Sequence, residues 1–423
     1  MSSSSASDSE DEAAFGRLVN IAAVDLVTLG SRIRELVSKA KASNGRLVET
    51  FSGSFNLVHI PQLDEAKMVI RIPISGQFSD LSGPAKEAID SQVQTINYIK
   101  GHTSIPVPKV FHLDTTANNG IGAPYIAMSY ISGRTLSRLW FDDSGHTPLK
   151  ERRRSILKEL AQAISQLNRL HFDKIGSLIP SSQGSGHDLG PCYEWDEGKD
   201  GTISAASSGP FLTTISFLKR FWAPTNDKSP CTVGAAKLLE EMLPHLPHSS
   251  EYVLALPDFD SQNVMADEEG DITGLIDWDN VQTVPGFIGC LRYPGWITRD
   301  WDPLMYGWPQ GRENSPDELQ KYREYYLYEM KQALKPQGSD GYRLTEKSHI
   351  FEAFWIAVSN VGNRTSICQK FVEEAKRRLD KKEMPDGLDQ DALSILYDIA
   401  AGELEGEDWE GLRKGLQALM TLE

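Results

Sequence analysis

The sequence has little cysteine and no long apolar run. Its four cysteines are scattered and include no C-x-x-C pair, which argues against a disulfide framework or a zinc knuckle and favours a reducing compartment. No apolar stretch approaches the ~18 residues that a membrane-spanning helix needs. The opening MSSSSASDSEDEAA also lacks the basic and apolar parts of a secretory leader. We therefore predict a cytoplasmic protein with no membrane partner.

Basic residues are also under-represented. The chain has 43 lysines and arginines against 59 aspartates and glutamates, a formal net charge of -16. A field of that sign repels nucleic acid, so we predict no nucleic-acid partner. The Ser/Asp/Glu-rich residues 1–12 have the composition of a disordered acidic tail.

What the sequence does have is a β-rich first part. "RLVETFSGSFNLVHI" (46–60) predicts two strands around a Ser-Gly-Ser turn, and "AKMVIRIPI" (66–74) predicts a third strand of an antiparallel meander. Residues 13–40 precede them with helical spacing, and Gly30 is a candidate break in that helix. Three further elements are expected: a helix over 84–100, a strand over 104–114 that is edged by prolines, and a strand over 124–131.

The second part is mainly helical. Apolar residues recur every three or four positions over 151–171, and helical patterns return from 315 to the end. Between them a Gly/Ser/Pro-rich stretch, 180–210, predicts an exposed insertion. We therefore predict an α+β fold, with an antiparallel β-rich N-terminal lobe over 13–131 and a mainly helical C-terminal lobe over 132–423.

Acidic and amide side chains gather in "LPDFDSQNVMADEEGDITGLIDWDN". The middle of this stretch predicts a hairpin with strands over 263–266 and 272–276. Asn263 and Asp277 then lie at its open ends, and Asp258 lies on the incoming loop. One carboxylate can act as a base while an amide oxygen and a second carboxylate hold a hard cation. Phosphoryl transfer divides the work in this way, with D-x-x-x-x-N supplying the base and one metal ligand, and a later Asp supplying another.

A family resemblance is carried by "DFDSQN" and "GLIDWD", together with "FSGSFNLV", "VIRIP", "TSIPVPKV", "PYIAMSYISGRTL" and "LNRLHFDKIGSL". These motifs resemble the aminoglycoside phosphotransferase-like family of the protein-kinase-like fold, and in particular its large fungal branch. The resemblance covers residues 15–310. It implies two kinase-like lobes, ATP or GTP as phosphoryl donor, magnesium, and a small-molecule substrate that carries the accepting hydroxyl.

The resemblance also implies roles for single residues. Asp258 would be the catalytic base, and Asn263 and Asp277 would be the magnesium ligands. The nucleotide-binding residues would be those of the glycine turn, the phosphate-holding arginine and the adenine hinge: Gly53, Ser54, Arg71, Met128, Ser129, Tyr130 and Ile131.

The sequence departs from the family pattern at three places. The letters LP precede the base where the family usually has His-Gly, and the missing histidine is mainly a structural support for the loop. Arg71 replaces the usual lysine and can grip phosphate with two N–H groups. The helix acid that should pair with it falls at Gln92, so a glutamate there is expected to complete the ion pair. Glu87 and Asp90 are the alternative partners on that helix.

Three questions stay open at the level of sequence. Asp279 is either a third metal ligand or part of a solvated loop. Aromatic and acidic residues in "CYEWDEG" and "RYPGWITRDWDPL" either receive a cationic, hydroxyl-bearing substrate or belong to packed tryptophans and solvated loops. The leading function is an ATP-dependent phosphotransferase that acts on a small-molecule hydroxyl. The alternative is a catalytically impaired pseudokinase that serves as a nucleotide-binding or scaffold protein.

Overall fold

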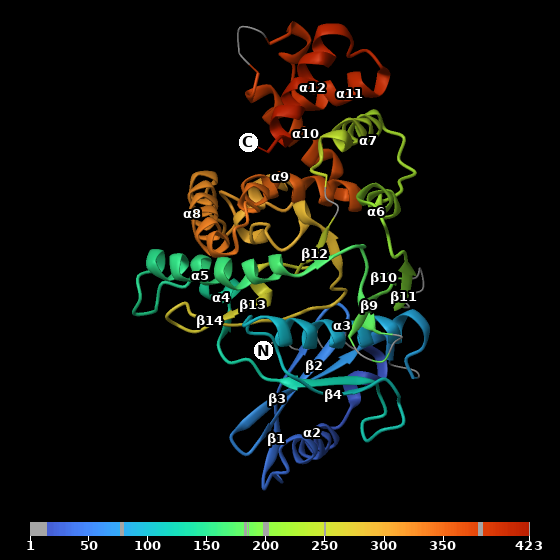
Figure 1. The fold of residues 1–423 in the computed structure, drawn as a ribbon, viewed down its shortest axis with the longest axis vertical. Coiled ribbons are helices and arrows are strands. Elements are labelled where there is room, and N and C mark those ends of the chain that lie inside the picture. The colour runs from blue at the N-terminus through green and yellow to red at the C-terminus, as the bar shows by residue number, and fades with distance from the viewer. Residues whose placement is uncertain are drawn as a thin grey trace. The chain divides into compact units, whose positions relative to one another are not determined.

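The chain forms two units in the computed structural model (Figure 1). The first unit takes in residues 1–133, 176–210 and 273–282, and the second takes in the remainder. The predicted lobe boundary lies near the first of these limits, whereas the two later segments of the first unit were not foreseen. The structure describes residues 15–76, 80–181, 184, 186–197, 203–248, 251–379 and 384–422, so the predicted tail lies outside it.

A five-stranded antiparallel sheet forms the centre of the first unit. The strand order is β1-β2-β3-β5-β4, and the first three strands confirm the predicted meander. The predicted fourth strand begins at Val110 rather than near 104, because Pro106 and Pro108 cannot donate ladder hydrogen bonds. The bounds are β1 (Gly45–Ser52), β2 (Asn56–Leu63), β3 (Ala66–Pro73), β4 (Val110–Asp114) and β5 (Tyr125–Ser129).

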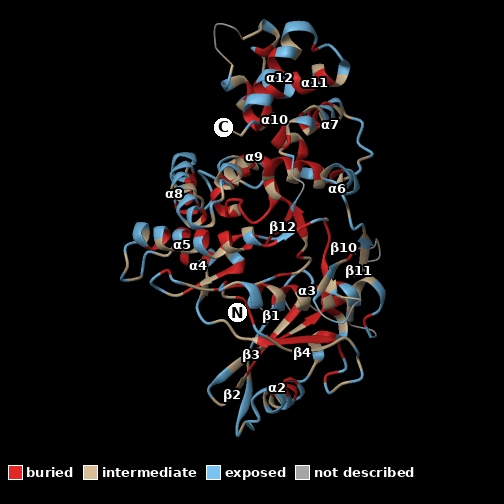
Figure 2. Ribbon diagram, in the orientation of Figure 1, coloured by how far each residue is buried: buried red, intermediate tan, exposed pale blue. Residues whose placement is uncertain are grey.

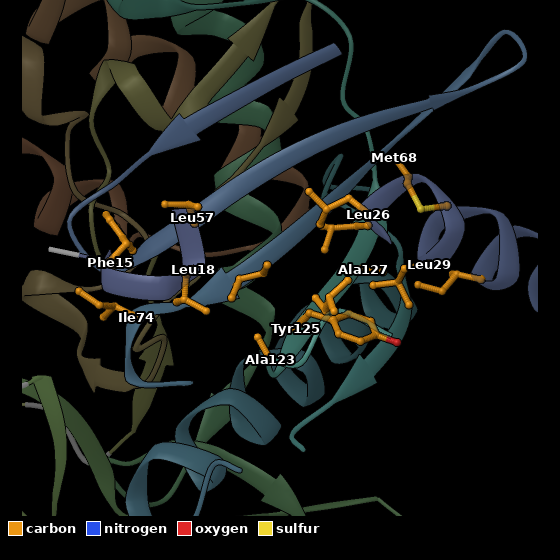
Figure 3. Close-up of a cluster of buried hydrophobic side chains, with 14 of the residues drawn as sticks. Phe15, Leu18, Leu26, Leu29, Leu57, Met68, Ile74, Ala123, Tyr125 and Ala127 are labelled. Carbon is orange, nitrogen blue, oxygen red and sulfur yellow. The ribbon is translucent and has the colours of Figure 1, made fainter. Parts of the chain in front are cut away.

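Two helices cover the two faces of this sheet. Along β5, Tyr125 and Ala127 join the apolar cluster beneath α2 (Ala23–Ser38), which Figure 3 shows. The alternate residues Ile126 and Met128 point to the other face and pack with Ile89 of α3 (Gly83–His102). Because both faces are covered, the central strands are buried, as Figure 2 shows in red. The sheet is therefore a rigid platform for the side chains that it carries.

The sequence suggested that Gly30 breaks the first helix, but it does not. It lies inside α2, and a Cβ atom there would meet Pro61, Leu63 and Met68 at 3.4 Å each. Gly30 therefore packs directly against the side chains of the sheet. The helical lead-in is otherwise divided, with a 3-10 turn at Gly16–Asn20 before α2.

The Gly/Ser/Pro-rich stretch is more ordered than predicted where the structure describes it. It forms the paired strands β8 (Leu178–Pro180) and β9 (His187–Leu189), and then the hairpin of β10 (Cys192–Glu197) and β11 (Ile203–Ser208). Tyr193 is buried and donates a hydrogen bond from its hydroxyl to Glu87 of α3, at 3.3 Å. The stretch is thus folded and buries Cys192 and Tyr193, while most of its other described residues are exposed or half-buried.

Helices dominate the second unit. The predicted amphipathic helix is α5, whose face of Ile156, Leu160 and Ile164 is buried; it ends at Ile164 and continues as a 3-10 turn. Together with the sheet of the first unit, these helices confirm the predicted α+β class. The remaining helices are α4 (Leu136–Leu139), α5 (Leu149–Ile164), α6 (Thr214–Phe221), α7 (Pro230–Met242), α8 (Pro316–Leu334), α9 (Tyr342–Ser359), α10 (Val361–Arg377), α11 (Ala392–Ala401) and α12 (Gly406–Met420).

Short strands complete the second unit. β12 pairs with β7 and β15, and β13 pairs with β6, all antiparallel. Within the part of the chain that the structure describes, no helix is both long and apolar enough to cross a bilayer. The bounds are β6 (Arg134–Thr135), β7 (His171–Phe172), β12 (Tyr252–Leu254), β13 (Val264–Ala266) and β15 (Thr283–Pro285), while β14 (Ile272–Leu275) leads from the second unit into the first.

Candidate functional site

The loop after β12 brings Asp258 and Asn263 together, as their spacing predicted. The buried Asn263 side chain donates from its amide nitrogen to the Asp258 Oδ2 atom at 2.9 Å and to the Asp258 backbone oxygen at 3.0 Å. Gln262 donates to the same Oδ2 atom at 2.7 Å. The Asp258 side chain is held in place by these bonds, yet the residue is exposed. A fixed and accessible carboxylate suits a general base.

Arg292 supports this loop from behind. Its Nη2 atom donates to the backbone oxygens of Leu256 and Pro257, at 2.6 and 2.9 Å, and its Nη1 atom lies 3.5 Å from Glu352. The Leu256 side chain is buried and apolar, so it contributes to the loop only by packing. The arginine thus supplies the hydrogen bonds that a histidine in the base motif was expected to provide.

A second arginine fixes the other end of the loop. Asp260 is buried, accepts a hydrogen bond from the backbone nitrogen of Ser261, and forms an ion pair with Arg299. The backbone of Gly295 donates to the Phe259 oxygen at 2.8 Å. The segment that follows β15 therefore holds the Asp258 loop at several points.

A cavity of about 270 Å³ opens beside Asp258. Its charged lining consists of four carboxylates and two guanidinium groups, and its aromatic lining includes Trp301 and Trp355. Burial raises the pKa of the Glu352 carboxyl, although Arg292 opposes that effect. The cavity wall includes several members of the predicted "RYPGWITRDWDPL" segment. The charged residues are Asp258, Asp260, Asp302, Glu352, Arg292 and Arg299.

The predicted hairpin leads to Asp277. Its turn is closed by the backbone hydrogen bond from Asp267 to Asp271, between β13 and β14. The chain then enters the first unit, where Trp278 is buried and donates from its indole nitrogen to the Leu275 oxygen at 3.0 Å. Asp277 adopts a left-handed backbone with φ of 61°, a conformation that aspartate tolerates better than most residues. Its side chain keeps 42% of its surface exposed.

Arg71 on β3 meets both acids of the I-D-W-D element. Its Nη2 atom donates to Asp277 at 2.9 Å, and its Nη1 atom donates to Asp279 at 2.7 Å. Asp279 is more buried than Asp277, with 19% of its side chain exposed. Burial raises the pKa of the Asp279 carboxyl, and the Arg71 guanidinium opposes that rise. The predicted phosphate-holding arginine and the predicted metal-binding acid are therefore neighbours.

The expected partner of Arg71 on helix α3 is corrected by this geometry. Gln92 does not replace a missing acid, since it donates to the Asp279 Oδ1 atom at 2.5 Å. Glu87 accepts from Tyr193, and Asp90 pairs with Lys86. The acid that pairs with the arginine comes from the loop after β14. A glutamate at position 92 would therefore confront a carboxylate instead of completing an ion pair.

The remaining nucleotide-site candidates lie on the same sheet. Gly53 begins the β1–β2 turn, and its backbone nitrogen donates to the Asn56 oxygen at 2.9 Å, with Ser54 next in the turn. Ser129 exchanges hydrogen bonds with Lys109 at the end of β5. The Ile131 side chain packs on Gly274, where an added Cβ atom would lie only 2.7 Å from it. Met128 is buried and Tyr130 lies under the Lys67 ammonium group at 4.9 Å. Their nucleotide-binding roles remain predictions.

The sequence profile of the phosphotransferase enzyme family matches residues 62–285, slightly more than half of the 423-residue chain. The chain belongs to this family. Its antiparallel sheet and its mainly helical second unit agree with the predicted α+β architecture. The matched range contains Arg71, the Asp258 loop and the I-D-W-D element.

Fungal proteins are among the curated relatives of this chain. The subtelomeric hrmA-associated cluster protein of Aspergillus fumigatus is 31% identical over 127 residues, which are 30% of this chain and 23% of that protein. Altered inheritance of mitochondria protein 9, mitochondrial, of Candida glabrata is 28% identical over 174 residues, 38% of this chain and 26% of that protein. Clavilactone A biosynthesis cluster protein Y of Ampulloclitocybe clavipes is 24% identical over 328 residues, 70% of this chain and 77% of that protein. The match spans about a quarter of the first two relatives.

Solved structures similar to this phosphotransferase include two antibiotic phosphotransferases. A thermostable mutant of aminoglycoside phosphotransferase APH(4)-Ia, in complex with AMP-PNP and hygromycin B, is 15% identical with a TM-score of 0.45, over 90% of this chain and 100% of that one. Spectinomycin phosphotransferase APH(9)-Ia, in complex with ADP and spectinomycin, is 12% identical with a TM-score of 0.34, over 88% of this chain and 98% of that one.

Two features of the candidate site could not be read from the sequence. Asp279 pairs with Arg71 and keeps only 19% of its side chain exposed, which does not fit the solvated loop that was one of the two alternatives for it. Arg292 was not singled out at all, although it holds the Asp258 loop. Tyr193 of "CYEWDEG", by contrast, packs on α3 within the first unit, so this segment's tyrosine is part of the lobe's packing.

Proposed function

We propose that this phosphotransferase transfers the γ-phosphoryl group of ATP to a hydroxyl group of a small molecule. The observation that carries the proposal is the accessible Asp258 carboxylate, held by Asn263 at 2.9 Å on the wall of a cavity. Family membership supports the reaction class. GTP is the alternative phosphoryl donor.

In the proposed reaction Asp258 orients the acceptor hydroxyl and takes its proton as the oxygen attacks the γ-phosphorus. The new O–P bond forms while the bond between the γ-phosphorus and the bridging oxygen breaks, and ADP leaves with that electron pair. Gln262 and Asn263 both donate to the Oδ2 atom of Asp258, so Oδ1 is the atom that receives the hydroxyl. Arg71 binds phosphate oxygens through its N–H groups, while the turn at Gly53 and Ser54 and the hinge at 128–131 hold the rest of the nucleotide.

The proposed magnesium ligands offer the oxygen atoms that this ion prefers. Asn263 engages Asp258 through its amide nitrogen, which leaves the amide oxygen as the ligand. The Asp277 carboxylate is accessible enough to receive a cation. No cluster of three or more histidine, cysteine or acidic side chains of metal-binding kind occurs among the residues that the structure describes. Phosphate oxygens would therefore complete the shell, and the bound ion would neutralise phosphate charge.

We infer that the acceptor is cationic. Four carboxylates face two guanidinium groups in the cavity lining, and burial lowers the pKa of His349 well below its usual range, so this histidine adds no positive charge. Trp301 and Trp355 add aromatic surface to the lining, where the Lys370 ammonium group already lies over the Trp301 ring at 5.5 Å and Trp355 stacks on Phe217. Such a lining favours an amine that also carries a hydroxyl.

The cytoplasm remains the proposed compartment. All four cysteines are free thiols, and three of them are buried, which fits a reducing environment. The relatives that are called mitochondrial make the mitochondrion the alternative. Fluorescence imaging of the tagged chain distinguishes the two.

The test of the proposed function compares the parent with Asp258→Asn. We expect the variant to bind magnesium-ATP within a few fold of the parent, while acceptor-dependent ADP release falls by roughly 10²-fold or more, because a base contributes ~10² to 10⁴ to such rates. Calorimetry measures binding, and a coupled assay with amino sugars and choline measures release. Asp340→Asn, at an exposed aspartate of the same unit, is the matched control.

Two results would contradict the proposal. If the parent binds magnesium-ATP but releases no ADP with or without any acceptor, the protein is the pseudokinase that the sequence left as an alternative. If Asp258→Asn turns over ATP at the parent's rate, Asp258 is not the base.

A further inference from the structure

The Asp279 carboxylate has no acceptor site left for a metal ion. A carboxylate offers about four lone-pair sites. At Asp279, Oδ1 accepts from Arg71 and Gln92 at 2.7 and 2.5 Å, and Oδ2 accepts from Arg71 and Asn56 at 2.5 and 2.9 Å. Four N–H groups from three elements, β2, β3 and α3, therefore saturate one side chain.

Asp277 differs from Asp279 in each of these respects. It receives one hydrogen bond from Arg71, through a single oxygen, and 42% of its side chain is exposed against 19% for Asp279. It can therefore leave the arginine for a cation at small cost, whereas the departure of Asp279 would leave the part-buried donors of Arg71, Gln92 and Asn56 without their acceptor.

We propose that Asp279 is the positioning residue for Arg71, and that Gln92 and Asn56 hold Asp279 in turn. This role rests on the proposed function. On binding of magnesium-ATP, Asp277 would give up its hydrogen bond with the Nη2 atom of Arg71 and bind the ion. A phosphate oxygen would then accept from that Nη2 atom. Asp279 stays, so the guanidinium keeps its orientation throughout the exchange.

The glutamine at position 92 follows from this arrangement. Gln92 and Arg71 donate to the same Asp279 oxygen, so the helix residue must present an N–H group there. A glutamate would place a second carboxylate against the first, and like charges at that distance repel strongly. The acid that pairs with Arg71 is therefore Asp279 of the loop, and the helix residue Gln92 donates an amide N–H group to it.

The proposal predicts that removing the Asp279 charge weakens metal-free ATP binding, whereas removing the Asp277 carboxylate does not. Asp279→Asn should weaken ATP binding by about tenfold, both in EDTA and with magnesium, because a guanidinium that loses its charged partner is no longer held toward the phosphates. Asp277→Ala should bind metal-free ATP at least as tightly as the parent, since a competitor for Arg71 is gone, yet lose the gain in affinity that magnesium gives.

Calorimetric titration of ATP into the full-length variants, in EDTA and in magnesium, measures both effects. Asp64→Asn is the matched control, because Asp64 also pairs with an arginine, Arg34, in the first unit but lies in the β2–β3 turn. Its ATP affinity should equal that of the parent in both buffers. Thermal unfolding of each variant shows whether it is folded.

A relocation of the charge tests the pairing itself. Gln92→Glu alone should weaken ATP binding, since it adds a carboxylate to the cluster. Combined with Asp279→Asn, the same change should restore affinity toward the parent's, because the acid then stands beside Arg71 on the helix side. A merely structural role for Asp279 predicts additive losses instead.

Three outcomes would overturn the role. The first is an Asp279→Asn variant that binds ATP like the parent, which leaves the proposed function standing. The second is a variant whose loss appears only with magnesium, which would make Asp279 a metal ligand. The third is a parent that binds no ATP in either buffer, which overturns the proposed function together with this inference.

Discussion

At the scale of single residues, the Arg292 guanidinium group is a main support of the Asp258 loop. Arg292 reaches two successive backbone oxygens with one nitrogen and approaches Glu352 with another. Only a planar fork with several N–H groups can make these contacts together, so lysine is not an equivalent residue here. The support for the catalytic loop thus comes from a residue some thirty positions later in the chain.

We expect Arg292→Lys to lower turnover by about tenfold or more while ATP affinity changes little, because a displaced base loses orientation whereas the nucleotide contacts belong to other residues. Steady-state rates at saturating ATP, with calorimetric ATP binding, measure the two effects. Arg292→Met leaves Glu352 buried without its partner and is expected to lower the unfolding midpoint as well.

Glu352→Gln is the control for that charge effect. It removes the carboxylate but keeps a side chain that can bond Thr298, whose hydroxyl contacts Glu352 at 3.2 Å. Paired with Arg292→Met, it should recover stability without recovering turnover. Recovery of turnover in the double variant would mean that Arg292 acts only through its charge and does not support the loop.

At the scale of elements, strand β2 carries a buried histidine. His59 has 3% of its surface exposed, and burial lowers its pKa to about 4 from the usual 6.5. Between these values the unfolded chain binds a proton that the folded chain does not, so stability is complete above pH 6.5 and falls as the pH drops toward 4. The loss approaches about 3 kcal/mol at the lower limit.

His59→Gln should remove this part of the pH dependence, since glutamine can still meet Thr50 but does not titrate. Urea unfolding of parent and variant at intervals from pH 7 to pH 4.5 measures the difference in unfolding free energy. As the pH falls, the unfolding free energy of the parent should decrease more than that of the variant. Parallel curves would show that His59 takes up its proton in the folded protein as well.

Most elements of the fold were predictable because their signals are local. Alternation and turn residues located β1, β2 and β3, and apolar spacing located α3 and α5. Gly30 was misjudged because its packing partners lie on β2 and β3, and helical spacing within the sequence does not reveal such contacts. The β10–β11 hairpin was missed because its small residues show little pattern until they pair and cover α3.

The candidate site divides in the same way. Asp258, Asn263 and Asp277 could be named as candidates because short motifs place them. The pairing of Arg71 with Asp279 joins residues 208 positions apart, and the contact of Arg292 with Leu256 joins residues 36 apart. No local pattern encodes such contacts, so the roles of Asp279 and Arg292 emerged only from the three-dimensional arrangement.

At the scale of the whole molecule, the net charge of -16 governs encounters with polyanions. We expect no binding to duplex DNA or to phosphatidylserine vesicles at ~0.1 M salt, because the excess of carboxylates repels both and few counterions would be released. Retention on a DNA column and co-sedimentation with vesicles measure it. Retention that weakens steeply with added salt would reveal a basic surface that the overall charge conceals.

The path of the chain between the two units has a consequence for the order of folding. The strip that holds Asp277 and Asp279 is residues 273–282, so the first unit receives its last piece only after residues 211–272 of the second unit have been synthesised. Until then the guanidinium on β3 has no carboxylate to meet, and the sheet and helices that carry it must form around an unpaired charge. The proposed nucleotide site is thus completed late, by a segment that follows the Asp258 loop in the chain, and a nascent chain that ends before this segment lacks the centre proposed to bind ATP.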